Sequence, residues 1–379
     1  MSDCERKVYL NNAATSWPKP ECVASAMAEA VRALPGAANR GGIRDFDVFE
    51  ALRGELSGWL GVSRPEQIAL GANSTWALNQ AIFGFPLRRG DTVLTTKAEH
   101  NAVLRPLYHL EQQGIRVIYL SVDKTGRVRP GDWEAALERY RPSLCVLNHA
   151  SNVTGAVNDA ERLSAMAGER GAAILLDLSQ SLGWMPVELE KWGVDMAAFT
   201  GHKYLLGPQG TGGLYVRPDL ELCPWLLGGT GVQSDRREMP EEMPLHLEAG
   251  TGNEPACHGL LAALRWAREN PVCRERTEAL LRELKNGLRE LGCRVIEPEP
   301  PVTPVISFIV PGWSPAEAGE ILADSYEIIC RTGLHCSPAI MEDLGVPEGT
   351  VRLSLSRFTE KEDICRVLEG VKALCENRF

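Results

Sequence analysis

Short, largely apolar runs recur between about residues 65 and 220, and segments with the apolar spacing of a helix lie between several of them. The runs are residues 68–70, 93–96, 117–120, 144–147, 173–176 and 196–199. The helical stripes are formed by Ala77, Leu78, Ala81 and Ile82, and by Leu163, Met166 and Ala167, with Gly171 as the cap of the second. Apolar strands joined by helices are typical of a mostly parallel sheet covered on both sides, so the pattern predicts an α/β fold.

The pattern changes on both sides of this region. Before it, a helical stripe follows Pro18 and Pro20 and consists of Val23, Met27, Ala30, Val31 and Leu34. After residue 265 come a long leucine-rich helix, a proline-rich break at 298–301, strands at 305–310 and 351–355, and a final helix. We therefore expect an N-terminal segment (residues 1–20) that packs with a small domain, a large domain (21–265) and a smaller C-terminal α+β domain (266–379).

Composition and charge narrow the class of protein. The 379 residues are 44% hydrophobic and 24% charged, which is ordinary for a globular chain and argues against disorder. The formal net charge of −10 disfavours nucleic acids and anionic membranes as partners. Apolar runs stay below the ~18 residues of a membrane-spanning helix, and the start of the chain lacks the apolar core of a signal peptide. We expect a cytoplasmic protein.

The eleven cysteines are scattered and odd in number, and none stands in a Cys-x-x-Cys pair or with zinc-ligand spacing. This pattern predicts neither a disulfide framework nor a metal site. We expect most of them, including Cys145, Cys365 and Cys375, to be small hydrophobic residues that are buried or half-buried. Cys336 is the exception, for reasons given below.

The stretch from Phe199 to Val216 carries the most informative chemistry. Lys203 follows an apolar strand, and four glycines lie between residues 207 and 213, so its amine can approach a cofactor aldehyde and form a Schiff base. Asp177 ends another strand, and Gln180 follows it. A carboxylate paired with the pyridine nitrogen of pyridoxal phosphate keeps that ring electron-withdrawing. Taken singly, a solvated lysine and a capping aspartate explain these residues equally well.

A phosphate site is indicated where residues 73–75 precede the helical stripe that begins at Ala77. Backbone N–H groups and hydroxyls at the N-terminus of a helix attract anions, and Thr200 could add a hydroxyl. An ordinary helix cap remains the alternative. The glycines between 207 and 213 match neither a dinucleotide-binding motif nor a P-loop.

Several short motifs stand in the order found in a known family. They are YLNNAAT (9–15), NRGG (39–42), NST (73–75), EHN (99–101), SNVTG (151–155), DLSQ (177–180), TGHK (200–203), EAGT (248–251), RTGLHC (331–336) and VRLSL (351–355). In this order the chain resembles the class V aminotransferase group of fold-type I pyridoxal phosphate enzymes, and within it the cysteine desulfurases and selenocysteine lyases. The resemblance covers nearly the whole chain and implies a large cofactor-binding domain, a small C-terminal domain and a homodimer.

The resemblance also assigns cofactor-binding roles. Lys203 would hold pyridoxal phosphate covalently and later shuttle the Cα proton of the substrate, while His100 would stack on the cofactor ring. Asp177 would pair with the ring nitrogen, and Gln180 would bond the ring oxygen. The phosphate would be held by Ser74, Thr75, Thr200 and His202, with Thr251 contributed by the neighbouring subunit.

The same resemblance assigns the substrate and the reaction. Asn152 and Arg352 would bind the carboxylate of L-cysteine or a related amino acid, a task that suits a planar guanidinium. The thiolate of Cys336 would take the substrate sulfur as a persulfide, release L-alanine and pass the sulfur to a thiol or an acceptor protein. A free thiol has a pKa of ~8.5, so only a few per cent is thiolate at neutral pH, and our hypothesis is that a neighbour such as His335 or a bound cation raises that fraction. We expect His149 to be an ordinary hydrogen-bonded histidine.

Four positions depart from the family pattern, and alternatives stay open. Leu334 replaces a common histidine, Ser337 an alanine, Trp76 an acidic residue and Asn11 an aspartate. These departures leave the substrate open among cysteine, selenocysteine and cysteine sulfinate, and a class V transamination on the same scaffold is a further alternative. The pathway (iron–sulfur cluster assembly, thiolated cofactors or selenium supply) is open too. A non-catalytic scaffold protein is disfavoured because it would need neither Lys203 nor Asp177.

Overall fold

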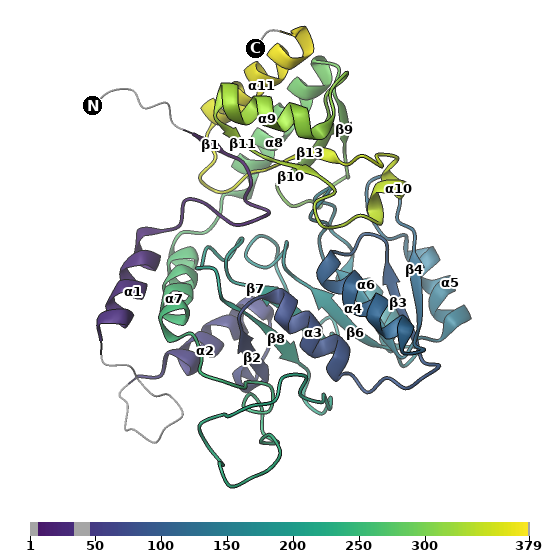
Figure 1. The fold of residues 1–379 in the computed structure, drawn as a ribbon, viewed down its shortest axis with the longest axis vertical. Coiled ribbons are helices and arrows are strands. Elements are labelled where there is room, and N and C mark those ends of the chain that lie inside the picture. The colour runs from purple at the N-terminus through teal and green to yellow at the C-terminus, as the bar shows by residue number, and fades with distance from the viewer. Residues whose placement is uncertain (1–6, 34–45, 378–379) are drawn as a thin grey trace.

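A computed structural model describes residues 7–33 and 46–377, so Leu34 and the NRGG motif lie outside the described residues. The larger part of the described chain is built on a seven-stranded sheet with the order β2-β8-β7-β6-β5-β3-β4 (Figure 1). Its strands are β2 (Ile68–Gly71), β3 (Thr92–Thr96), β4 (Arg116–Leu120), β5 (Leu144–Asn148), β6 (Ala173–Asp177), β7 (Met196–Thr200) and β8 (Gly212–Val216). Strands β3 to β7 pair in parallel, whereas β8 is antiparallel to both β7 and β2. The predicted mostly parallel sheet is confirmed.

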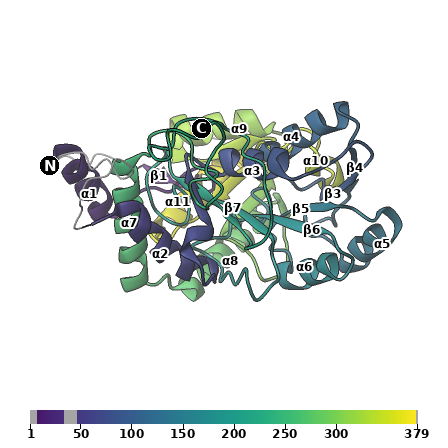
Figure 2. The same cartoon turned by 90° about the horizontal axis from the view of Figure 1, so that it is seen from below.

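Helices cover both faces of this sheet, because its central strands are apolar on both sides. One face packs against α3 (Ser74–Gly84) and α4 (Asn101–Gln112). The opposite face packs against α2 (Val48–Leu60), α5 (Pro130–Tyr140), α6 (Ala160–Gly168) and α7 (Glu254–Glu269). Figure 2 shows α3 and α4 on one side of the sheet and α5 and α6 on the other. A short 3-10 helix, η1 (Pro65–Gln67), precedes β2.

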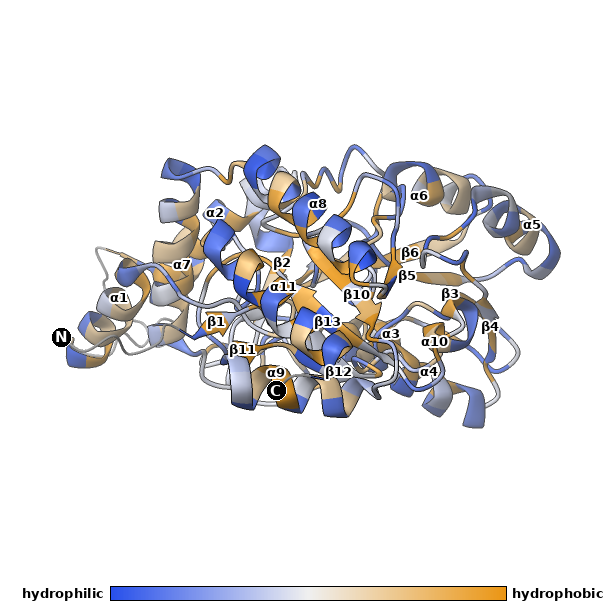
Figure 3. Ribbon diagram, turned by 90° about the horizontal axis from the view of Figure 1, so that it is seen from above, coloured by the Kyte–Doolittle hydropathy of each residue, from blue (hydrophilic) through white to orange (hydrophobic). Residues whose placement is uncertain are grey.

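A second, smaller core lies beside the large one. Its four-stranded antiparallel sheet has the order β12-β13-β10-β9 and consists of β9 (Arg294–Ile296), β10 (Val305–Ile309), β12 (Arg331–Gly333) and β13 (Thr350–Ser354). Its helices are α8 (Arg274–Glu290), α9 (Pro315–Tyr326) and α11 (Lys361–Glu376), whereas the buried side chains of α10 (Ile340–Leu344) belong to the large core. In Figure 3 hydrophilic positions on α8 and α11 lie over the strongly hydrophobic β10 and β13. The N-terminal strand β1 (Val8–Tyr9) pairs in parallel with β11 (Ile328–Ile329), so this end of the chain joins the small core.

The two cores divide the chain between α7 and α8. Leu260 and Leu264 of α7 belong to the large core, whereas Leu280 and Leu284 of α8 belong to the small one. We propose a domain boundary at residues 270–273, a little beyond the position expected from the sequence.

One expectation about buried residues was wrong, that for Cys365, and the first helix buries less of its apolar stripe than the large core does. In α1 (Glu21–Arg32) only Val23 is buried, and Val31 is 71% exposed. The helix packs chiefly on α7, so one line of side chains is covered. Cys365 is exposed on α11, although Cys145 is buried and Cys375 half-buried. In the described ranges no helix is long and apolar enough to cross a membrane, and no cluster of His, Cys, Asp or Glu suits a metal ion.

Candidate active site

A pocket lies at the carboxyl ends of β5 and β6, the edge at which parallel sheets bind ligands. Its lining residues enclose about 370 Å³ of space that is continuous with solvent. Its lining residues are Ser74, His100, Asn148, Ala150, Asn152, Asp177, Ser179, Gln180 and Lys203. The structure thus brings together most of the side chains that the sequence marks for the cofactor ring, and it adds Asn148 and Ser179, which sequence reasoning missed.

Lys203 lies at the pocket wall, three residues beyond the end of β7. Burial lowers the pKa of its amine to about 8, and the charges of Arg352 and Arg331 act in the same direction against the opposing charge of Asp177. At neutral pH a useful fraction of the amine is therefore uncharged, which is the form that attacks a carbonyl carbon.

The peptide before Lys203 is fixed by the N-terminal segment. The carbonyl oxygen of His202 accepts hydrogen bonds from Ser16 N at 3.0 Å, Ser16 Oγ at 3.1 Å, Thr15 Oγ1 at 3.2 Å and Lys19 Nζ at 3.1 Å. Lys19 also donates to the hydroxyl and the carbonyl oxygen of Ser16. Burial lowers the pKa of Lys19 to about 8. Sequence reasoning missed this cluster because its partners are far apart along the chain.

Asp177 and Gln180 present polar atoms to the same pocket. Oδ1 of Asp177 accepts from the backbone N–H of Ser179 at 2.9 Å and from its hydroxyl at 2.5 Å. Nε2 of Gln180 donates to the carbonyl oxygen of Ala13 at 2.9 Å. Its Oε1 is buried and has no hydrogen-bond partner within residues 7–33 and 46–377. A buried amide oxygen without a partner costs free energy, so the pocket suits a ligand with a polar group at this point.

His100 is the N-cap of α4, and its Nδ1 accepts a hydrogen bond from Ala102 N at 3.0 Å. This contact assigns the proton of the neutral ring to Nε2. Burial, followed by the charge of Lys203, lowers the pKa of His100 to about 4. A neutral, fixed imidazole in the pocket wall can lie against a planar ligand without adding charge.

The residues expected at a phosphate are only partly gathered. Ser74 opens α3 and lines the pocket, and Asn73 caps that helix by accepting from Trp76 N at 2.9 Å. Gly212 permits the close approach of β8, because a Cβ there would lie 2.8 Å from the Cα of Asn73. Thr75 is exposed and does not line the pocket.

Three further candidates lie outside the lining of this pocket. The hydroxyl of Thr200 donates to Thr211 O at 3.3 Å, so it is engaged by the backbone. Burial lowers the pKa of His202 to about 4, and its buried Nδ1 has no partner in the described part of the chain. Thr251 is exposed on the molecular surface, where a second subunit could reach it.

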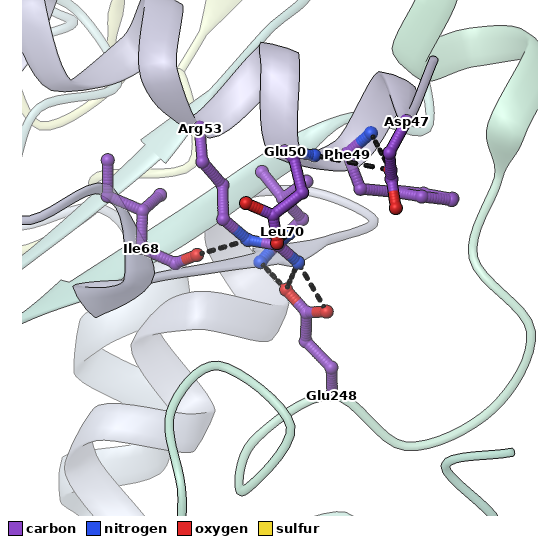
Figure 4. A network of polar contacts seen from close by, with 7 residues as sticks. All are labelled: Asp47, Phe49, Glu50, Arg53, Ile68, Leu70 and Glu248. Carbon is purple, nitrogen blue, oxygen red and sulfur yellow. Dashed lines mark hydrogen bonds and ion pairs between the residues drawn. The ribbon is translucent and has the colours of Figure 1, made fainter. Parts of the chain in front are cut away.

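A buried ion pair fixes the segment that carries Thr251 (Figure 4). One guanidinium nitrogen of Arg53 lies 2.7 Å from both carboxylate oxygens of Glu248, and Nε donates to Ile68 O at 3.1 Å. Leu70 N also donates to Glu248 at 2.6 Å. Glu248 is thereby anchored to β2 and α2 three residues before Thr251.

The loop with Cys336 joins the two cores. His335 and Cys336 have φ angles of 53° and 58°, a left-handed conformation that side chains adopt at a cost. The loop is held by Asn152 Nδ2, which donates to His335 O at 2.7 Å, and by Asn101 N, which donates to Cys336 O at 2.7 Å. Ser337 donates to Oδ1 of Asn152 at 2.8 Å. Asn152 thus has its side-chain amide engaged by the loop, and the serine that departs from the family pattern takes part in this anchor.

The thiol of Cys336 has a different neighbour from the expected one. His335 was a candidate for supplying positive charge, but its Nε2 lies 2.8 Å from Thr350 Oγ1, and burial lowers the pKa of His335 to about 2. That histidine is neutral, and the expectation was wrong. Instead Arg331 donates to Cys336 Sγ at 3.2 Å. Its position within RTGLHC was the signal that sequence reasoning passed over.

Arg352 lies opposite Arg331 in the register of β12 and β13. It is 2% exposed, donates to Asn152 O at 2.9 Å and to Asn11 Oδ1 at 3.2 Å, and its Nε has no partner among the described residues. Burial, followed by the charge of Arg331, lowers the pKa of Arg352 to about 10. Two guanidinium groups this close, one of them with a buried free N–H, favour an anionic ligand such as a carboxylate.

His149 lies apart from the pocket lining. It is buried, its ring centroid is 5.3 Å from that of Trp192 in an edge-on contact, and burial lowers its pKa to about 4. Its side chain therefore packs as part of the protein interior.

Comparison with known proteins places this geometry in a family context. The model of the aminotransferase class-V family matches residues 8–367. A protein of Methanothermobacter thermautotrophicus described as a probable cysteine desulfurase is 31% identical over 370 residues, which are 94% of this chain and 92% of that protein. The cysteine desulfurase CsdA of Escherichia coli is 29% identical, over 97% of this chain and 94% of that protein.

Solved structures agree with the sequence comparison. The apo structure of a cysteine desulfurase from Thermococcus onnurineus has a TM-score of 0.89 at 30% identity and covers 98% of this chain and 95% of its own. The Escherichia coli CsdA structure in an S-sulfonic acid form has a TM-score of 0.85 at 27% identity, over 98% and 96% of the two chains.

Proposed function

Since the chain belongs to the aminotransferase class-V family and, within it, to the cysteine desulfurases, we propose that it converts L-cysteine to L-alanine with pyridoxal phosphate as cofactor and Cys336 as sulfur carrier. The observation that carries this proposal is one pocket that contains the amine of Lys203 and the carboxylate of Asp177. The loop of Cys336 rests directly on Asn152 of the same pocket wall. An amine, an acid and a thiol are the three groups that this reaction needs.

The residues present fit the cofactor. Lys203 is the amine that would carry it, Asp177 is the acid for its ring nitrogen, and the free Oε1 of Gln180 is a buried polar atom that lacks a partner in the described chain. Ser74 at the N-terminus of α3 would contact its phosphate, whereas Thr75, Thr200 and His202, which lie outside the pocket lining, would have to reach the phosphate from around it. When bound, pyridoxal phosphate supplies an electron-withdrawing ring that stabilises negative charge at the substrate Cα.

This chain's own residues would move the proton and position the substrate. The amine of Lys203, released when the substrate binds, would take the Cα proton, which its lowered pKa permits near neutral pH. His100 would lie against the cofactor ring as a neutral wall. The substrate carboxylate would meet the guanidinium of Arg352, with Asn152 positioned between that arginine and the thiol loop.

The sulfur step balances without an added oxidant. The thiolate of Cys336 forms a sulfur–sulfur bond with the substrate, and the carbon–sulfur bond of L-cysteine breaks. The carbon skeleton keeps the electron pair of that bond, takes up one proton, equal to the one that Cys336 lost in forming its thiolate, and leaves as L-alanine. The enzyme keeps a Cys336 persulfide, which transfers its outer sulfur to a thiol of an acceptor. Arg331, which donates to Sγ, would hold the sulfur in place for this step.

The proposal includes a homodimer, a cytoplasmic setting and a sulfur-acceptor protein, with supply of sulfur for iron–sulfur clusters as one destination. An exposed apolar run supports the dimer: Trp225, Leu226 and Leu227 are 49%, 44% and 71% exposed, and Trp225 stacks on Phe83 at 5.9 Å. Such a patch is typical of a protein interface. Exposed Thr251 would then contact the phosphate in the partner's pocket.

The test uses the purified protein reconstituted with pyridoxal phosphate. Borohydride should fix the cofactor to Lys203, and L-cysteine should yield alanine and one added sulfur atom on Cys336 by mass spectrometry. Cys336→Ala should retain the cofactor and lose sulfide release from cysteine. Parental turnover of cysteine by Cys336→Ala would refute the role of the thiol, and a colourless protein that takes up no cofactor would refute the whole proposal.

A further inference from the structure

Glu99 is a titratable side chain beside the pocket that the mechanism above does not use. It follows β3, precedes His100 and is fully enclosed, with 0% of its surface exposed. Oε1 accepts three hydrogen bonds, from Thr96 Oγ1 at 2.7 Å, from Asn148 N at 3.1 Å and from Asn148 Nδ2 at 3.0 Å. Oε2 is buried and has no partner among the residues that the structure describes.

The unequal hydrogen bonding of the two carboxyl oxygens of Glu99 is typical of a protonated, uncharged carboxyl group. A carboxylate spreads its charge over both oxygens, and an enclosed charged oxygen without a donor is costly. A protonated carboxyl group instead has one carbonyl oxygen that accepts hydrogen bonds and one hydroxyl. Burial raises the pKa of Glu99 to about 8, and the negative charge of Asp177 acts in the same direction.

The surroundings of Glu99 connect it to the cofactor pocket. Asn148, which donates two hydrogen bonds to Glu99, lines that pocket and pairs with Asp177 in the register of β5 and β6. Asp177 on β6 is the charged group that acts on Glu99, whereas β3 contributes the uncharged Thr96 and β5 the uncharged Asn148. His100, the next residue, is neutral at physiological pH because burial lowers its pKa to about 4.

We propose that Glu99 is a positioning residue that works as a neutral acid, and that its carbonyl oxygen fixes Asn148 in the pocket wall. Because protonated Glu99 carries no charge, the carboxylate of Asp177 is the anion that acts on Lys203. A second negative charge beside Asp177 would stabilise the ammonium form of Lys203 and reduce the fraction of reactive amine. Ionisation of Glu99 above about pH 8 therefore opposes the chemistry at this pocket. This inference rests on the proposed function, since the role of Asp177 belongs to it.

The first experiment needs no cofactor. Infrared spectra of the apo protein at pH 7 should contain the carbonyl stretch of protonated Glu99. Exposed acids are ionised at this pH and do not contribute to that band. The band should shift when glutamate is labelled with ¹³C, disappear as the pH is raised above about 8, and be absent from Glu99→Gln. Glu248→Gln, which alters a half-buried acid held by Arg53, is the matched control and should leave the band in place.

The second experiment measures binding of pyridoxal phosphate by absorbance. Glu99→Ala removes the acceptor of three buried hydrogen bonds and should weaken binding by roughly ten- to a hundred-fold. Glu99→Gln presents an amide oxygen to the same donors and should recover most of that loss. A residue needed as a carboxylate would give the reverse result, with the glutamine variant as weak as the alanine variant.

Three outcomes overturn the inference: the wild-type protein has no glutamate carboxyl band at pH 7, the band persists in Glu99→Gln, or Glu99→Gln binds cofactor as weakly as Glu99→Ala. A Glu99→Gln variant that does not fold also counts against the inference, because a site built for a neutral carboxyl group should accept an amide of the same shape. In that case the infrared spectrum of the wild-type protein still decides whether Glu99 is protonated. Failure of the wild-type protein to bind pyridoxal phosphate would instead overturn the proposed function and leave the infrared result standing.

Discussion

The ion pair between Arg53 and Glu248 offers the sharpest test of how the large core is held together. The side chain of Arg53 is 6% exposed and that of Glu248 is 18% exposed, and two further hydrogen bonds tie the pair to β2 (Figure 4). Arg53→Met keeps much of the apolar stem and removes the charge. It leaves the carboxylate of Glu248 half-buried, with the backbone N–H of Leu70 as its hydrogen-bond donor.

The expected loss follows from this geometry. Removing one partner of a buried pair typically costs about 3–5 kcal/mol. Because Glu248 keeps some contact with solvent and the bond from Leu70, we place Arg53→Met near the lower end, about 3 kcal/mol in the free energy of unfolding. Glu248→Leu leaves a buried guanidinium and should cost a similar amount. The double variant should be more stable than the sum of the two losses implies, since neither charge is then stranded.

Urea unfolding followed by circular dichroism measures these values, with stability extrapolated to water. The matched control is Arg129→Met, which breaks the exposed pair with Asp132 (64% and 55% exposed) and should change the midpoint little. Losses from Arg53→Met and Glu248→Leu that simply add would refute the reasoning, as would an Arg53→Met variant no less stable than the control.

Three further predictions concern the pocket and its surroundings. Arg331→Met removes the donor to Cys336 Sγ, so alkylation of Cys336 at pH 7 should slow several-fold, with exposed Cys365 as the internal reference; equal slowing of both thiols would contradict this. Glu99 has a raised pKa, so its contribution to stability is full below about pH 4.5 and is lost as the pH rises to about 8; unfolding of Glu99→Gln should lack this slope of about 1.4 kcal/mol per pH unit, and parallel profiles would contradict it. In an absorbance titration Lys19→Met should bind pyridoxal phosphate more weakly, while Lys19→Arg retains the affinity. An unchanged affinity in Lys19→Met would show that the hydrogen bond from Lys19 to the His202 carbonyl oxygen does not support the site.

The sheet was predictable where its strands are apolar runs, and less so at β8, which lies between β2 and β7. Strands β5 and β7 are buried at every position, so a run of apolar residues is a reliable signal for them. Strand β8 begins with Gly212 and Gly213, which have low strand propensity, and it was not predicted. These glycines are required by the fold, because a Cβ on Gly213 would lie 2.6 Å from the ring of Phe199. Local propensity and tertiary packing disagree at this strand, and packing decides.

The residues of the site likewise include some that were predictable from the sequence and some whose contacts were not. Lys203 and Asp177 were identified because strand ends and their order along the chain are visible in the sequence. The sequence suggested the adjacent His335 or a bound cation as a neighbour of the Cys336 thiol, whereas the structure places Arg331, five residues earlier, against it. Adjacent residues on an extended loop point in different directions, and the left-handed turn at His335 directs that side chain to Thr350. Such partnerships depend on the pairing of β12 with β13, which composition and spacing do not reveal.

The N-terminal segment explains how two separate cores share one site. Asn11 accepts a hydrogen bond from Arg352, and Ala13 accepts one from Gln180. Ser16 and Lys19 then hold the carbonyl oxygen beside Lys203. Within residues 11–19 the chain therefore contacts, in this order, the arginine of the small core, the amide of the cofactor pocket and the carbonyl oxygen beside its lysine. Because the segment joins the small core through β1, any shift of Arg352 relative to Lys203 must deform it, so its hydrogen bonds set the distance across which substrate and cofactor would meet.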